Sequence, residues 1–169
     1  MRAIIVYESI WGNTQDVARA IAGALEPTMD VELIDAQDAP HNVDGYDLII
    51  VGGPTHAFSM SRPATREAAL NQNCPSPVRS RGIREWIHEL RSASSLAPVA
   101  TFDTRADSPR LPGSAARAAR HELRLLGFAA EARPISFYVH GYDGPLLEGE
   151  LARAAAWAQG LVTSPVVAH

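Results

Sequence analysis

Six consecutive residues near the start of the chain combine hydroxyl, amide and glycine groups in an order suited to binding phosphate. The segment reads Ser9-Ile10-Trp11-Gly12-Asn13-Thr14, and it lies between an apolar run and a segment with helical spacing. A turn from a strand into a helix leaves backbone N–H groups pointing at one place, where the helix dipole adds partial positive charge. The hydroxyl groups of Ser9 and Thr14 supply further donors, and Asn13 is placed to cap the helix. The segment predicts a site for a phosphate monoester.

Two other kinds of phosphate loop are excluded. The chain has no G-x-x-x-x-G-K-[ST] motif and no lysine at all, so the cation that reaches the outer phosphates in such loops is missing. It also has no G-x-G-x-x-G motif, whose glycines let a pyrophosphate approach the backbone. A single terminal phosphate is the favoured ligand group.

Apolar runs and helical patterns alternate along the chain. Buried strands are expected at residues 3–7, 31–34, 48–51, 98–102 and about 132–139. Helices are expected at about 14–25, 82–90, 114–126 and 145–160, with a weak helix in 35–47 and a short one at 65–70. This alternation predicts an α/β fold with a doubly wound parallel sheet, helices on both faces and three layers.

Ligands of such sheets bind beyond the carboxyl ends of the strands. The segment after the third expected strand reads Gly52-Gly53-Pro54-Thr55-His56-Ala57-Phe58. Together with residues 7–14, it resembles the two flavin loops of the flavodoxin family. The resemblance implies a flavodoxin-like five-stranded sheet of order 2-1-3-4-5 and FMN as the cofactor. It places Pro54 and Thr55 at the ribityl chain, and it places His56, Ala57 and Phe58 beside the isoalloxazine ring.

The third expected loop matches that family in position only. Asp103, Thr104 and Arg105 follow the fourth strand, and the resemblance implies that their backbone binds the pyrimidine edge of the flavin. No Tyr or Trp follows Phe102 to cover the outer face of the ring. Trp11 either replaces that aromatic side chain or packs over the phosphate loop and docks a partner. The sequence leaves both interpretations open.

The residues expected around the flavin differ from the family in two further respects. Arg62, Arg66 and Arg105 are expected near the mouth of the site, where cations stabilise a reduced, anionic flavin. We therefore expect a second-electron midpoint potential less negative than in strongly acidic flavodoxins. Residues 57–60 contain no glycine, so a peptide flip in that segment would cost more than in relatives that have one.

Composition narrows the classes of function. At 169 residues and 46% hydrophobic content, the chain is expected to form one domain over residues 1–169, with a long loop at about 61–82 that acts as a lid, a docking surface or a plain connection. The net charge of −4 and the lack of a basic block argue against nucleic acid. No apolar run suits a membrane span, no leader pattern is visible, and the histidines lack metal-ligand spacing. We expect a cytoplasmic protein with no membrane and no metal partner.

Three classes of function remain open. The favoured one is an FMN-binding flavodoxin-like protein in electron transfer, with no catalytic residue of its own and with a redox partner that is a reductase or an acceptor. The second is an FMN-dependent oxidoreductase, such as a quinone reductase or a protoporphyrinogen-oxidase-like enzyme. The third is an interaction module that binds no flavin.

Overall fold

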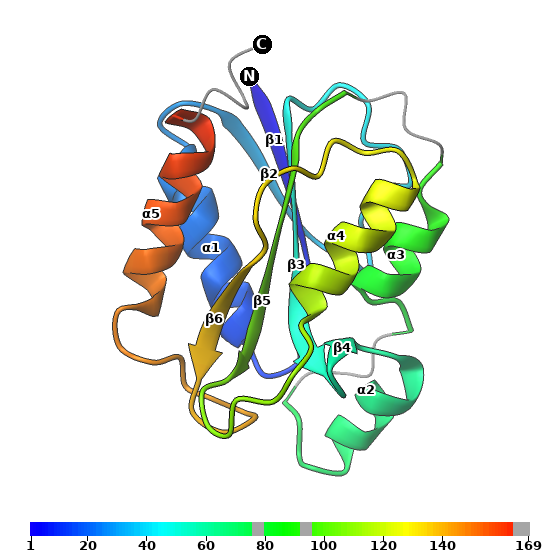
Figure 1. Ribbon diagram of the computed structural model, residues 1–169, viewed down its shortest axis with the longest axis vertical. Helices are drawn as coiled ribbons and strands as arrows, with labels where there is room; N and C mark the ends of the chain where they lie inside the picture. The colour runs from blue at the N-terminus through cyan, green and yellow to red at the C-terminus, as the bar shows by residue number, and fades with distance from the viewer. Residues whose placement is uncertain (76–79, 92–95, 164–169) are drawn as a thin grey trace.

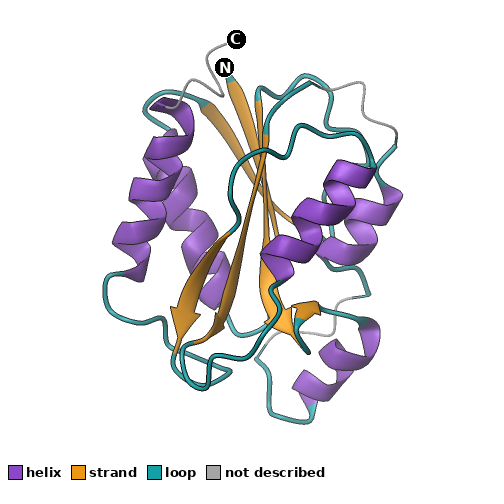
Figure 2. Cartoon of the chain, in the orientation of Figure 1, coloured by secondary structure: helices purple, strands orange, loops and turns teal. Residues whose placement is uncertain are grey.

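The computed structural model describes residues 1–75, 80–91 and 96–163, and these form a twisted sheet covered by helices on both faces (Figures 1 and 2). The elements in chain order are β1 (Arg2–Tyr7), α1 (Asn13–Leu25), β2 (Asp30–Asp35), β3 (Leu48–His56), β4 (Ser59–Met60), α2 (Pro63–Leu70), α3 (Ile83–Glu89), β5 (Val99–Ala106), α4 (Ala115–Leu125), β6 (Ile135–Val139) and α5 (Glu150–Thr163). Among the described residues, no helix has the length and hydropathy needed to cross a bilayer.

The sheet has the order β2-β1-β3-β5-β6, and neighbouring strands along this path are parallel. These five strands confirm the predicted order 2-1-3-4-5. The short strand β4 was not predicted, and it pairs antiparallel with the end of β3, opposite Thr55 and His56. The sheet therefore has six strands, and the additional one lies where the site was expected.

Two apolar cores lie on opposite faces of the sheet. Along β1, Ile4 and Val6 pack into the core under α3 and α4, whereas Ala3, Ile5 and Tyr7 pack into the core under α1 and α5. This alternation follows from the period of two along a strand. Figure 1 shows α1 with α5 on one side of the sheet and α3 with α4 on the other, which confirms the three predicted layers.

Several elements differ from expectation. Strand β3, expected at residues 48–51, runs from Leu48 to His56. Strand β5 continues past Phe102 to Ala106, because Asp103 to Ala106 pair with β6. The last helix begins at Glu150 rather than near residue 145, because the chain after β6 first folds back through a bridge between Val139 and Leu146. Residues 36–46 contain no helix. The predicted short helix at 65–70 is α2, which begins at Pro63; residues 76–79 of the expected long loop lie outside the described residues.

Candidate functional site

A cleft of about 310 Å³ opens at the carboxyl ends of the central strands. Figure 2 shows the parallel strands running toward the edge of the sheet where α2 lies. Ten predicted site residues line this cleft: Ile10, Trp11, Asn13, Thr14, Pro54, Thr55, His56, Ala57, Thr104 and Arg105. The folded chain thus brings the three predicted segments to one place, although they are far apart in the sequence.

The turn between β1 and α1 has the geometry of an anion site. Gly12 has a φ of 98°, a left-handed conformation in which glycine avoids a steric penalty, and its N–H donates to the Ser9 hydroxyl over 3.1 Å. The first amide bonded within the helix is that of Asp16, which donates to the Gly12 carbonyl. The preceding amides, of Asn13, Thr14 and Gln15, have no carbonyl acceptor within the helix. These amides remain as donors at the positive end of the helix dipole.

Asn13 was predicted to cap this helix, but it does not. It is the first residue of α1, and Gly12 occupies the cap position without a side-chain hydrogen bond. The Asn13 amide instead donates from Nδ2 to the carbonyl of Asp143 over 2.9 Å, which ties the turn to the segment after β6. The cap position requires a left-handed backbone conformation in this turn, and Gly12 adopts it without a steric penalty. The Asn13 side chain instead connects this turn to the loop after β6.

Thr14 and Thr104 join the turn between β1 and α1 to strand β5. Their hydroxyl oxygens are 2.7 Å apart, and both side chains are buried. Because one hydroxyl donates to the other, the accepting hydroxyl keeps its own proton for a third group. The pair therefore adds one more donor beside the amides of the turn.

The β3–β4 hairpin turns through Ala57 and Phe58. The φ angles are 46° and 71°, so two non-glycine residues adopt the left-handed conformation that two-residue hairpins usually fill with Asn-Gly. Gly113 packs closely on this turn, and a Cβ there would lie 2.1 Å from the Phe58 oxygen. Arg84 supports the short strand from below by donating to the Met60 carbonyl over 2.8 Å. Gly113 and Arg84, from neighbouring segments of the same chain, therefore hold a strained turn at the edge of the cleft.

The Phe58 side chain does not line the cleft. It is 54% exposed, and it lines a smaller hollow of about 150 Å³ with Leu111 and Pro112. Ala57 and Arg105 border both spaces. The aromatic ring predicted to flank a flavin therefore lies next to the main cleft rather than inside it.

A buried charge network lies beneath the cleft. Arg66 is 3% exposed; its guanidinium donates to Ser61 over 2.8 Å and to Glu85 over 2.8 Å, and it lies 3.7 Å from a carboxylate oxygen of Glu8. Glu8 also accepts from the Ser61 hydroxyl and from the Ile83 amide. Burial raises the pKa of Glu8. Arg66 was expected at the mouth of the site, but its charge is instead enclosed and balanced by two carboxylates.

His56 lines the cleft as a neutral side chain at pH 7. Burial, aided by the nearby Arg66 charge, lowers the pKa of His56 to about 4. Of the predicted cations, Arg105 lines the cleft, and its guanidinium donates to the Leu111 carbonyl.

Asp103 does not line the cleft, but its hydrogen bonds hold neighbouring segments of the cleft in place. It is fully buried, and one carboxylate oxygen accepts from the Ser114 hydroxyl, from the Ala116 amide over 3.0 Å and from Thr55 over 3.1 Å. These bonds join the start of α4 to the carboxyl end of β3. Since residues 103–105 belong to a strand paired on both sides up to Thr104, their backbone faces other strands. Ser9 and Gly12 likewise shape their turn without lining the cleft.

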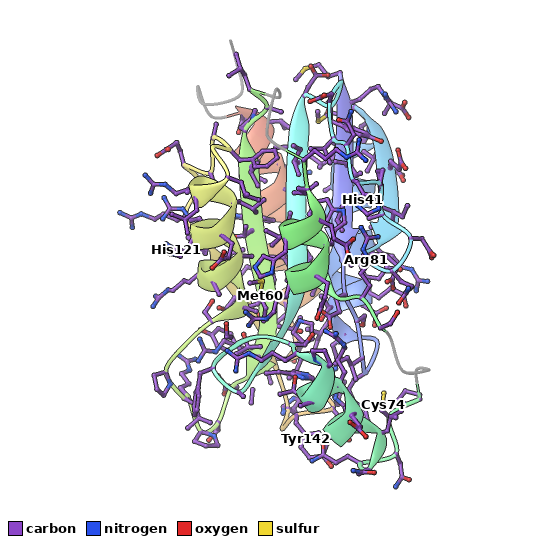
Figure 3. The ribbon with its side chains drawn as sticks, turned by 90° about the vertical axis from the view of Figure 1, so that its right-hand side faces the viewer. His41, Met60, Cys74, Arg81, His121 and Tyr142 are labelled. Atoms are coloured by element: carbon purple, nitrogen blue, oxygen red, sulfur yellow. The ribbon has the colours of Figure 1, made fainter. Side chains whose placement is uncertain are left out.

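Several lining residues were missed from the sequence. Thr65, Ala68, Ala69 and Gln72 form a wall from α2 and the turn after it, and Ala106, Val139 and Tyr142 close the opposite side. The ring of Tyr142 meets that of Trp11 edge to face, with centroids 5.5 Å apart. Figure 3 shows Tyr142 and Cys74 near α2 at the same end of the molecule. The thiol of Cys74 donates to the Ile10 carbonyl over 3.3 Å.

The pairing of Trp11 with Tyr142 bears on the role left open for Trp11. Both rings line the cleft beside the turn at Gly12. The sequence contained one usable signal for this arrangement, the Gly-Tyr-Asp-Gly turn after the last strand, which ends at the carboxyl edge of the sheet.

Across the described residues, no group of three or more His, Cys, Asp or Glu side chains is placed to hold a metal ion.

Comparisons with known proteins agree with this architecture. Residues 4–66 match the family model described as a flavodoxin domain. A flavodoxin from the domain Archaea superposes with a TM-score of 0.67 at 20% identity over 100% of both chains. Oxidised flavodoxin 1 from Bacillus cereus gives 0.71 at 18% identity over 96% of this chain and 98% of that one. A WrbA-like flavodoxin from Agrobacterium tumefaciens gives 0.57 at 18% identity over 96% and 95%. No curated protein matches significantly.

The sheet order, the layers and the cleft at the carboxyl edge define a doubly wound α/β fold with a cleft at the point where the strand order reverses, which is where ligands of such folds bind. The matched region contains the turn between β1 and α1 and the whole of the β3–β4 hairpin. The chain therefore has a flavodoxin-like fold, and its residues 4–66 resemble the flavodoxin domain.

Proposed function

We propose that the chain binds FMN in this cleft and acts in electron transfer with a protein partner. The observation that carries the proposal is the turn at Gly12, because the first residues of α1 that follow it, Asn13 and Thr14, line the same cleft as the β3–β4 hairpin. The proposal keeps the cytoplasmic location predicted from the sequence.

The phosphate of FMN would bind at the start of α1. The amides of Asn13, Thr14 and Gln15, together with the Thr14–Thr104 hydroxyl pair, supply donors that suit a dianionic terminal phosphate. The described part of the cleft holds no acidic side chain among its lining residues, so a dianion would meet no opposing charge there.

The ring system would lie toward the β3–β4 hairpin. Pro54, Thr55, His56 and Ala57 form that side of the cleft, and Arg105 supplies a cation near it. Bound FMN would supply one-electron and two-electron redox chemistry. The neutral His56 offers a polar edge without a charge, whereas Arg105 favours an anionic, reduced ligand.

The first test is selectivity for the phosphate. Flavin-stripped protein is titrated with FMN and with riboflavin, and bound flavin is followed by absorbance and fluorescence. We expect FMN to bind much more tightly than riboflavin. Thr14→Ala should weaken FMN binding by about 1–3 kcal/mol and leave riboflavin binding unchanged, because only the phosphate uses that donor.

Thr28→Ala is the matched control, since Thr28 is exposed and its hydroxyl donates to the Leu25 carbonyl at the far end of α1. It should bind FMN like the parent protein. Equal affinities for FMN and riboflavin would contradict the phosphate site. If neither flavin binds, the interaction-module alternative takes its place.

A second assay separates an electron carrier from an oxidoreductase. The flavin-loaded protein is mixed with NADPH or NADH and a quinone, with and without an added flavodoxin reductase. A carrier should reduce the acceptor only when the reductase is present. Steady turnover without a reductase would instead support the FMN-dependent oxidoreductase, such as a quinone reductase.

A further inference from the structure

A second concave site lies on α4, outside the cleft. Its hollow of about 280 Å³ is lined by Arg117, Arg120, His121, Arg124 and Pro134. The four basic residues follow the spacing i, i+3, i+4, i+7 and so share one face of the helix. Figure 3 shows His121 on the side of α4 away from α3. The lining contains no acidic residue, although the chain as a whole has a net charge of −4.

The basic side chains of this face have few partners among the described residues. Within the described part of the chain, Arg117, His121 and Arg124 form no ion pair with an acidic side chain, and neighbouring Glu122 turns toward His88 on α3. Arg120 is held in place because its Nε donates to the Ala130 carbonyl over 2.8 Å. One guanidinium is therefore fixed, and two others flank it in solvent.

This arrangement does not favour the helix itself. Like charges three or four residues apart repel each other on a helix surface. Arg117 also lies in the first turn of α4, where the helix dipole disfavours a cation, and that turn contains no acidic residue. A bound anion would relieve both costs at once.

We propose that the face formed by Arg117, Arg120, His121 and Arg124 binds a compact phosphate-bearing polyanion, of the size of a diphosphate group or a diphosphate ester. Guanidinium groups form paired hydrogen bonds with phosphate oxygens, and several around one hollow favour a ligand with more than one charge. The volume exceeds that of a single phosphate, and the concave shape suits a small ligand better than a flat protein surface. This inference does not depend on FMN binding.

The test is calorimetric titration with inorganic pyrophosphate, compared with inorganic phosphate at the same ionic strength. We expect pyrophosphate to bind more tightly than phosphate. The double variant Arg117→Gln/Arg124→Gln should weaken pyrophosphate binding about tenfold or more, the effect of losing charge-assisted hydrogen bonds.

The matched control is Arg19→Gln/Arg91→Gln, which removes the same charge from exposed positions outside α4. It should change the affinity by less than about twofold, since distant exposed charges are screened. Equal losses in the two double variants would overturn the proposal, because binding would then follow net charge alone. Loss of binding in Thr14→Ala but not in Arg117→Gln/Arg124→Gln would also overturn it, by placing pyrophosphate in the cleft. Absence of binding to the parent protein would do the same.

Discussion

Acidification should destabilise the protein through His56 more than through any exposed histidine. Burial and the Arg66 charge lower the pKa of His56 to about 4, against an ordinary value of 6.5. The folded protein therefore keeps this side chain neutral while the unfolded chain takes up a proton. The stabilisation is complete above pH 6.5 and is lost as the pH falls toward 4.

The size of the effect follows from the two pKa values. Each tenfold change in a protonation constant is worth about 1.4 kcal/mol, so the full contribution is about 3 kcal/mol. Between pH 8 and pH 5, linkage gives a loss of about 2 kcal/mol from this one group. Carboxyl groups also titrate in this range, and for this reason the prediction concerns a difference between variants.

The assay is urea unfolding at a series of pH values for the parent protein, His56→Asn and His140→Asn. His140 is exposed, and its replacement serves as the control. Between pH 8 and pH 5, the parent and His140→Asn should lose about 2 kcal/mol more unfolding free energy than His56→Asn. Parallel curves for all three proteins would refute the assigned environment of His56.

Two other predictions concern the edges of the cleft. Ala57→Gly should raise the unfolding free energy by about 0.5–1 kcal/mol, because relief of left-handed strain exceeds the entropy cost of glycine. The control Ala64→Gly, at an exposed position of α2, should lower it by about 1 kcal/mol. Urea unfolding that shows both variants to be destabilised would contradict this reasoning. If FMN binds as proposed, Arg105→Gln should make the second-electron midpoint potential more negative by about 30–60 mV in spectroelectrochemistry, since a cation near the anionic flavin is lost. An unchanged or less negative potential would count against Arg105 lying beside the ring.

The parts of the fold predicted from sequence are those fixed by local pattern. The apolar runs of Ile and Val marked the five parallel strands, and the resemblance to the flavodoxin family supplied their order, which the structure confirms. The turn before α1 was predictable because glycine, hydroxyl groups and the start of a helix occur together within residues 9–14. In these places, the local preference and the packed structure agree.

The missed features depend on contacts between distant segments. Strand β4 is only Ser59–Met60 and follows a turn of Ala and Phe, so it carries no hairpin signal. Arg66 was expected near the mouth of the site, but Glu8 and Glu85, distant in sequence, enclose it. Likewise, Tyr142 reaches the cleft because the chain after β6 folds back on itself before α5 begins. No periodicity within these segments reports such partners.

The central claim, that the start of α1 holds the phosphate of FMN, is tested most directly by NMR mapping. Backbone amide resonances of the flavin-free, isotopically labelled protein are compared before and after addition of FMN and of riboflavin. The account predicts that the amides of Asn13, Thr14 and Gln15 shift strongly with FMN and much less with riboflavin, while those of Thr55 to Ala57 shift with both. Shifts absent from the start of α1, or confined to the Arg117–Arg124 face, would contradict it.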